Sequence, residues 1–214
     1  KSKNVDILPV DSEHNAIYQV LDVKNKSKIS RLILTASGGP FLNKKIDDLK
    51  NISPDEAIKH PNWSMGKKIS IDSATMMNKG LELIEACYLF GISEKKIEVV
   101  IHPESIIHSC VEYMDGSMLS QMGTPDMRTP ISFTLAYPER IKTNVKRLNL
   151  HEIQKLTFFK PDFKKYPCLE LAYHALELGK SAPTILNAAN EIAVDKFLKE
   201  QIQFLSISKI VEKT

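Results

Sequence analysis

The feature that most constrains the fold is a change of pattern along the chain. Up to about residue 136, short apolar runs typical of buried strands alternate with segments whose apolar residues are spaced for one face of a helix. From Cys168 onward the pattern is only helical, with Gly179 as the expected C-cap of the first helix. Strands that alternate with helices favour a parallel or mixed sheet. The sequence therefore predicts an α/β (α+β-like) unit with a mixed sheet, followed by a small all-α bundle.

Local patterns place the individual elements. The expected strands are residues 5–10, 31–36, 68–72 and 96–102, with residues 108–114 and 118–122 forming a hairpin around the Asp115-Gly116 turn. One helix is expected after residue 15, and a second begins at the Ser53-Pro54 capping box. Further helices are expected at residues 75–90, 127–136 and 183–199, and another begins near Ser206.

Composition along the chain suggests three parts. We expect an α/β domain at residues 1–138, a linker rich in charges at 139–162, and part of a helical domain at 163–214. The chain begins at Lys1 rather than Met and ends inside a helix-like pattern, so we expect it to be a piece of a longer protein.

The bulk composition excludes several classes of protein. The net charge of +3 comes from mixed acids and bases, whereas a nucleic-acid groove needs clustered Lys and Arg. The three cysteines are widely spaced and predict neither a disulfide scaffold nor a zinc site, so we expect a reducing compartment. No apolar run is long enough for a membrane span, and we expect no signal peptide.

Two carboxylates follow the first expected strand. Asp11 and Glu13 flank Ser12, and on an extended segment side chains at i and i+2 project to the same side. Hard oxygen ligands at the carboxyl end of a strand suit a divalent metal. The alternative is that Asp11 or Ser12 caps the following helix, and the segment alone leaves both interpretations open.

A third carboxylate is needed to complete a metal site. Glu82, one helical turn after Asn78 and Lys79, is one candidate, and Glu85 fits the same description. Three carboxylates with water or substrate oxygens would suit Mg²⁺ or Mn²⁺. Each acid could equally be a solvated helix residue, and spacing does not choose between them.

Small and polar residues indicate an anion site. Residues 73–80 straddle an expected helix start, where backbone N–H groups favour an anion, and Ser73, Asn78 and Lys79 add hydrogen bonds and charge. Ser37 opens a second small turn of the type that cradles phosphate. Each feature alone also fits an ordinary turn or cap, but their combination favours phosphate binding.

The loop at residues 60–66 contains the single Trp of the chain. Trp63 is either a core anchor or a lid that excludes water from a site. His60 has several possible roles, among them anion binding and helix capping. Met127, in a rigid turn, could simply precede a helix. Asn190, inside an expected helix, indicates tight packing rather than chemistry.

Six segments in order carry a specific resemblance. They are residues 9–16 (PVDSEHNA), 37–41 (SGGPF), 60–66 (HPNWSMG), 71–82 (IDSATMMNKGLE), 125–130 (PDMRTP) and 186–191 (LNAANE). Together they closely resemble the 1-deoxy-D-xylulose 5-phosphate reductoisomerase family of the non-mevalonate isoprenoid pathway. The resemblance covers essentially the whole chain.

The resemblance implies a role for each matching position. One divalent ion, Mg²⁺ or Mn²⁺, would be bound by Asp11, Glu13 and Glu82, which favours Glu82 over Glu85. The substrate would be bound by Ser12, Glu13, Ser37, His60, Trp63, Ser73, Asn78, Lys79 and Glu82, with the phosphate at Ser37, His60, Ser73, Asn78 and Lys79. Glu13, Trp63 and Lys79 would act in catalysis, and Met65, Gly66 and Met127 would lie on the nicotinamide side.

The resemblance also implies the reaction. The family rearranges a sugar phosphate by metal-assisted retro-aldol and aldol steps, then reduces the product with hydride from NADPH. Family members bind NADPH in an N-terminal domain. Nothing like its glycine-rich motif occurs here, so we expect this chain to be inactive alone. A homodimer formed through the hairpin at 108–122 is implied, in the bacterial cytoplasm or in a plastid.

Two rival functions remain from the residues themselves. One is a metal-dependent sugar-phosphate aldolase or isomerase that needs no nicotinamide. The other is a non-catalytic module that binds metal and phosphate, against which the unbroken acidic and phosphate-binding sets argue.

Overall fold

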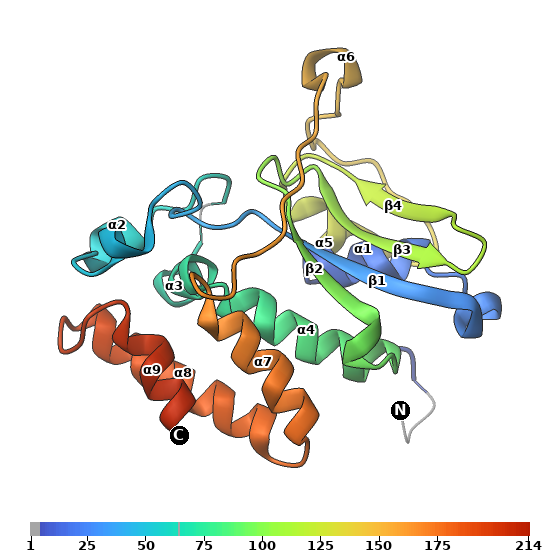
Figure 1. Ribbon diagram of the computed structural model, residues 1–214. Coiled ribbons are helices and arrows are strands. Elements are labelled where there is room, and N and C mark those ends of the chain that lie inside the picture. The colour runs from blue at the N-terminus through green and yellow to red at the C-terminus, as the bar shows by residue number, and fades with distance from the viewer. Residues whose placement is uncertain (1–4, 64) are drawn as a thin grey trace. The chain divides into compact units, whose positions relative to one another are not determined.

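The computed structural model of the protein describes residues 5–63 and 65–214 (Figure 1). The described chain forms two compact units, one comprising residues up to Thr35 and 96–159, the other residues 36–95 and 160–214. The α/β fold class expected from the sequence is confirmed. The boundaries at 138 and 162 stay a prediction.

The first unit is built on a four-stranded sheet in the order β2-β1-β3-β4. Its strands are β1 (Ile29–Ala36), β2 (Ile97–Ile101), β3 (Ile107–Tyr113) and β4 (Met118–Met122). The pairs β1–β3 and β3–β4 are antiparallel. The predicted hairpin is confirmed, and Gly116 in its turn has a φ of 84°, which glycine adopts without strain.

Helix α1 (Ser12–Val20) packs against β3 and β4, and Ile17 on this helix is fully buried. Helix α5 (Arg128–Ala136) contacts α1, and α6 (Leu150–Ile153) is a single turn within the expected linker. Buried His102 has a structural role, because Nδ1 lies 2.9 Å from the carbonyl of Thr157 and Nε2 accepts two backbone N–H groups. Short 3₁₀ segments cover Val23–Lys28 and Glu94–Lys96.

The second unit is helical. Its helices are α2 (Pro54–Ala57), α3 (Lys67–Thr75), α4 (Met77–Phe90), α7 (Pro167–Leu178), α8 (Ala182–Leu198) and α9 (Ser206–Lys213), with a 3₁₀ turn at Ile46–Leu49. Helix α4 packs on α7, and α8 packs on α3 and α9. The buried core joins Ile71 of α3 to Phe197 of α8 and to Phe41 and Phe204. The predicted C-cap at Gly179 and the capping box at Ser53 are confirmed.

The strand predicted at residues 68–72 is wrong, because this segment is the body of α3. Alternation would place Ile69 and Ile71 on one face, but Ile69 is 40% exposed and Ile71 is fully buried. The buried positions Ile71, Ala74 and Thr75 have helical spacing instead.

The strand predicted at residues 5–10 is also wrong, since the segment has no strand assignment and Val5, Ile7 and Val10 are exposed. The carbonyl of Pro9 is bonded by side chains, from Asn15 and Thr134, rather than by a neighbouring strand.

In the described part of the chain, none of the helices is both long and apolar enough to cross a membrane. Cys87, Cys110 and Cys168 are all free thiols.

Candidate functional site

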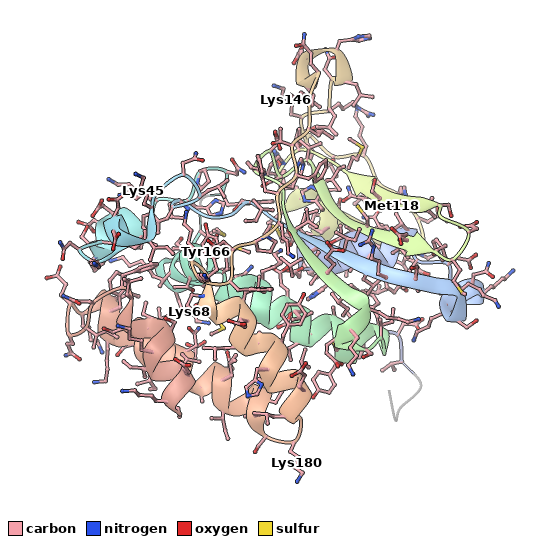
Figure 2. The ribbon with its side chains drawn as sticks, viewed as in Figure 1. Lys45, Lys68, Met118, Lys146, Tyr166 and Lys180 are labelled. Carbon is pink, nitrogen blue, oxygen red and sulfur yellow. The ribbon has the colours of Figure 1, made fainter. Side chains whose placement is uncertain are left out.

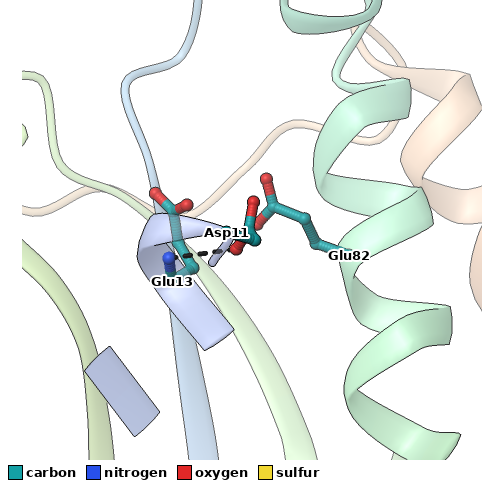
Figure 3. A group of neighbouring side chains, drawn as sticks. All are labelled: Asp11, Glu13 and Glu82. Atoms are coloured by element: carbon teal, nitrogen blue, oxygen red, sulfur yellow. Dashed lines mark hydrogen bonds between the residues drawn. The ribbon is translucent and has the colours of Figure 1, made fainter. Parts of the chain in front are cut away.

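In the first unit, the acidic turn stands at the start of α1. Asp11 is the N-cap, and its Oδ1 accepts hydrogen bonds from the backbone N–H groups of Glu13 and His14, each at 3.0 Å. Figure 3 shows the bond from Glu13. The hydroxyl of Ser12 donates to Oε2 of Glu13 at 2.7 Å. Of the two caps that the sequence left open, Asp11 is therefore the one that the structure shows. Because the cap uses Oδ1, it leaves Oδ2 of the same carboxylate as a possible metal ligand.

The sequence reading did not single out His14. This side chain is 3% exposed, and its Nδ1 lies 3.4 Å from Oδ1 of Asp11. Its place beside the acidic motif was visible in the sequence, but its burial was not.

In the second unit, Glu82 lies on α4 (Figure 3). Its side chain is only 3% exposed, whereas Glu85 is exposed. The amide of Asn78 donates to Oε1 of Glu82, and Nζ of Lys79 lies at Oε2, both at 2.5 Å. Lys79 is itself only 5% exposed. A buried carboxylate held by an amide and an ammonium is not a solvated helix acid, so the structure favours Glu82 over Glu85 as a functional group.

Ser37 and His60 are brought together in the same unit. The Ser37 hydroxyl lies 2.9 Å from Nε2 of His60. Nδ1 of His60 accepts from the backbone N–H groups of Asn62 and Trp63, at 3.1 and 3.0 Å. The ring proton therefore lies on Nε2, which donates to Ser37. Burial lowers the pKa of His60 to about 4, so the ring is neutral near pH 7.

The turn that follows Ser37 packs against the end of α3. Gly39 has a φ of 67°, and a Cβ at this position would lie 2.7 Å from the backbone oxygen of Ser73. Only glycine allows this approach, which brings the Ser37 turn and Ser73 against one another. Two separate predicted phosphate-binding segments thus meet in the structure.

Met76 separates α3 from α4 with a left-handed φ of 61°. Asn78 and Lys79 consequently fall in the first turn of α4, as the predicted helix start required. Backbone N–H groups of a first turn have no partners within their own helix and attract anions.

The remaining predicted site residues are Trp63, Met65, Gly66 and Met127. Trp63 and Met65 are half-buried, and Gly66 is the N-cap of α3. Ser64, between them, lies outside the described residues. Met127 belongs to the first unit, where it is 38% exposed at the start of α5.

Comparisons with known proteins agree with the motif pattern. Residues 7–90 match a family profile described as 1-deoxy-D-xylulose 5-phosphate reductoisomerase C-terminal domain, and residues 122–214 match the DXP reductoisomerase C-terminal domain. A curated relative from Nitrosococcus oceani, named 1-deoxy-D-xylulose 5-phosphate reductoisomerase, is 55% identical over 215 residues, covering 98% of this chain and 55% of the relative.

Two solved structures are also similar. A DOX-P reductoisomerase in complex with NADPH, fosmidomycin and magnesium has a TM-score of 0.93 and 57% identity, over 96% of this chain and 53% of that one. The enzyme from Zymomonas mobilis in complex with NADPH has a TM-score of 0.92 and 49% identity, over 99% and 54%. The chain spans about half the length of the relatives that it matches.

Proposed function

Because this chain belongs to the 1-deoxy-D-xylulose 5-phosphate reductoisomerase family, we propose that it is the metal- and substrate-binding part of such an enzyme. The complete protein would convert 1-deoxy-D-xylulose 5-phosphate into 2-C-methyl-D-erythritol 4-phosphate with NADPH as reductant. The observation that carries this proposal is identity of 49–57% with structures that together contain NADPH, fosmidomycin and magnesium, over nearly all of this chain. NADPH would be bound mainly by a part of the protein outside this chain, with Met65, Gly66 and Met127 beside the nicotinamide.

We propose that Asp11, Glu13 and Glu82 hold one divalent ion, Mg²⁺ or Mn²⁺. All three donors are carboxylates, the hard oxygen ligands that these ions prefer. When bound, such an ion stabilises negative charge that develops on substrate oxygens during carbon–carbon bond cleavage. Glu82 is buried with the ammonium of Lys79 beside it. A bound cation would be a second partner for this carboxylate and would leave Lys79 able to contact the phosphate.

The phosphate of the substrate would be held in the second unit. Ser37, Ser73 and Asn78 offer neutral hydrogen bonds, and Lys79 offers the charge. His60 is neutral, with its proton on Nε2, and now donates that proton to the Ser37 hydroxyl. When phosphate binds, the same N–H group would donate to a phosphate oxygen instead. A neutral donor set with one ammonium binds a dianion without a cluster of repelling cations.

In the first unit, Ser12 would orient substrate oxygens beside Glu13, to which its hydroxyl already donates. Trp63 would close over the carbon chain and exclude water from the reacting carbons. Nδ1 of His60 accepts hydrogen bonds from the backbone N–H groups of Asn62 and Trp63. Phosphate binding by His60 would therefore be linked to closure of Trp63 over the substrate.

The test uses the complete protein and a matched pair of variants on one helix. Wild-type protein should oxidise NADPH only when both the sugar phosphate and Mg²⁺ are present. Glu82→Gln should abolish this turnover, and Glu85→Gln, which alters an exposed acid one turn away, should keep it. Loss of sugar phosphate without NADPH oxidation would instead identify an aldolase or isomerase.

We further propose that the enzyme is a homodimer formed through the β3–β4 hairpin. Strand β4 ends the sheet, so one edge of its backbone is open to a partner strand. Met114, Met118 and Leu119 are 71%, 48% and 46% exposed, and Figure 2 marks Met118 on this strand. Sedimentation of the complete protein as a monomer at micromolar concentration would contradict this proposal.

A further inference from the structure

A buried hydrogen-bonded pair links α3 to α8 in the second unit. Nδ2 of Asn190, on α8, lies 2.8 Å from Oδ1 of Asp72, on α3, and the two residues are 0% and 2% exposed. The other oxygen of Asp72 lies 2.7 Å from Nζ of Lys68, whose ammonium also contacts Glu191 at 2.6 Å. Figure 2 marks Lys68 near α3. None of these four residues has a part in the proposed chemistry.

The hydrogen bonds and ion pairs around Asp72 contribute little to the stability of the fold. Burial raises the pKa of Asp72, while the hydrogen bonds from Asn190 and Lys68 act in the opposite direction. Oδ1 of Asn190 is buried and has no hydrogen-bond partner among the described residues. Apolar side chains of similar volume would fill the same space at lower cost. A directional contact retained at such a cost is more useful for fixing an orientation than for adding stability.

The orientation that it fixes is that of the phosphate-binding end of α3. Asp72 immediately precedes Ser73, and the helix ends two residues later at Thr75. The backbone of Ser73 is in close contact with Gly39, at the turn that carries Ser37. A rotation of α3 about its axis would therefore turn the Ser73 hydroxyl and disturb the Ser37 turn together. Apolar contacts allow such a rotation, whereas the Asn190–Asp72 bond resists it.

We propose that Asn190 and Asp72 are positioning residues for the phosphate site: their hydrogen bond sets the rotation of α3 and thereby the direction of the Ser73 hydroxyl. This inference rests on the proposed role of Ser73 as a phosphate ligand. It assigns to α8, which supplies none of the proposed ligands, a specific part in substrate binding.

The test compares Asn190→Ala with Asn187→Ala in the complete protein. Both changes remove an amide from α8, but Asn187 is exposed and Asn190 is buried. Asn190→Ala should raise the KM for the sugar phosphate about tenfold, the loss expected when one hydrogen bond to a charged group is misplaced. Inhibition by inorganic phosphate should weaken by the same factor. The kcat and the KM for NADPH should stay within about twofold, and Asn187→Ala should match the wild type throughout.

A charge-preserving exchange completes the test. Asp72→Asn combined with Asn190→Asp restores an amide–carboxylate bond in the reverse direction, so it should return the KM for the sugar phosphate to within about threefold of the wild type. If Asn190→Ala does not fold, the KM of the exchange variant still tests the proposal.

Two results would overturn the inference: an unchanged KM in folded Asn190→Ala, or a folded exchange variant whose KM stays as high as that of the single change. A parallel loss of kcat, both KM values and melting temperature would show a merely structural role and would also overturn it. Wild-type protein without NADPH-dependent turnover would instead refute the proposed function itself.

Discussion

Replacement of Gly39 by Ala tests whether the Ser37 turn and Ser73 act as one phosphate site. At a φ of 67° an L-residue is strained, and the added Cβ would lie 2.7 Å from the oxygen and 3.1 Å from the carbonyl carbon of Ser73. Both obstacles are backbone atoms, which cannot move aside by changing a rotamer. Either the turn or the end of α3 must shift.

The expected cost has two parts. A left-handed conformation costs an L-residue about 1–2 kcal/mol. Forcing a methyl group into packed backbone typically costs about 1–3 kcal/mol more. Gly39→Ala should therefore lower the free energy of unfolding by about 2–5 kcal/mol.

Gly116→Ala is the matched control. Gly116 has a φ of 84°, but nothing lies within 4 Å of the Cβ that it would gain. It should show only the conformational cost, about 1–2 kcal/mol. The difference between the two variants, about 1–3 kcal/mol, measures the contact with Ser73 and corresponds to about 2–12 °C in melting temperature for a chain of about 200 residues.

The assay is thermal unfolding of both variants in the complete protein, followed by the KM for the sugar phosphate. Gly39→Ala should be the less stable variant and should raise this KM, because Ser37 and Ser73 are displaced together, whereas Gly116→Ala should leave it unchanged. Equal melting temperatures, or a normal KM in Gly39→Ala, would refute the packing argument.

Three further predictions concern the complete enzyme. Glu13→Gln should abolish metal-dependent turnover because it removes a charged ligand; wild-type activity across a Mg²⁺ titration would remove Glu13 from the metal site. Trp63→Ala should lower turnover and weaken substrate binding with little change in melting temperature, whereas a large fall in melting temperature would make Trp63 a core residue. Since burial lowers the pKa of His60 to about 4 from about 6.5 in the unfolded chain, the unfolded state binds more protons between these values. Stability from His60 is therefore complete above about pH 6.5 and is lost as pH falls toward about 4. Denaturant titrations should show a smaller loss over this range in His60→Gln, and an equal loss would contradict the assignment.

The parts of the fold that the sequence predicted well depend on local chemistry. Asp11 caps α1, Ser53 and Glu56 form a capping box, and the Asp115-Gly116 turn closes a hairpin, because each device is complete within a few residues. The segment at 68–72 was misread because Ile69 and Ile71 alternate with polar residues, a pattern that matches a strand over so short a length. Asp72 is instead buried against Asn190 of α8, a partner more than 100 residues away in the sequence.

The candidate site divides in the same way. The carboxylates, the serines and Lys79 were predicted from residue type and motif. The choice between Glu82 and Glu85, the proton position on His60 and the bond from Asn190 to Asp72 depend on burial and on contacts between distant segments. Such contacts leave no local signal in one sequence.

Met76 shows how a helix break can escape prediction from the sequence. Residues 67–79 contain neither glycine nor proline, and the sequence predicted a strand at 68–72 followed by one continuous helix from Thr75. The structure instead places Met76, 2% exposed, in a left-handed conformation that costs a non-glycine residue about 1–2 kcal/mol. That local cost gives α4 a new first turn at Asn78 and Lys79, with backbone N–H groups that a continuous helix would have used internally. A break that local propensity opposes, placed where the proposed phosphate site needs it, is the kind of strain that clusters at functional sites.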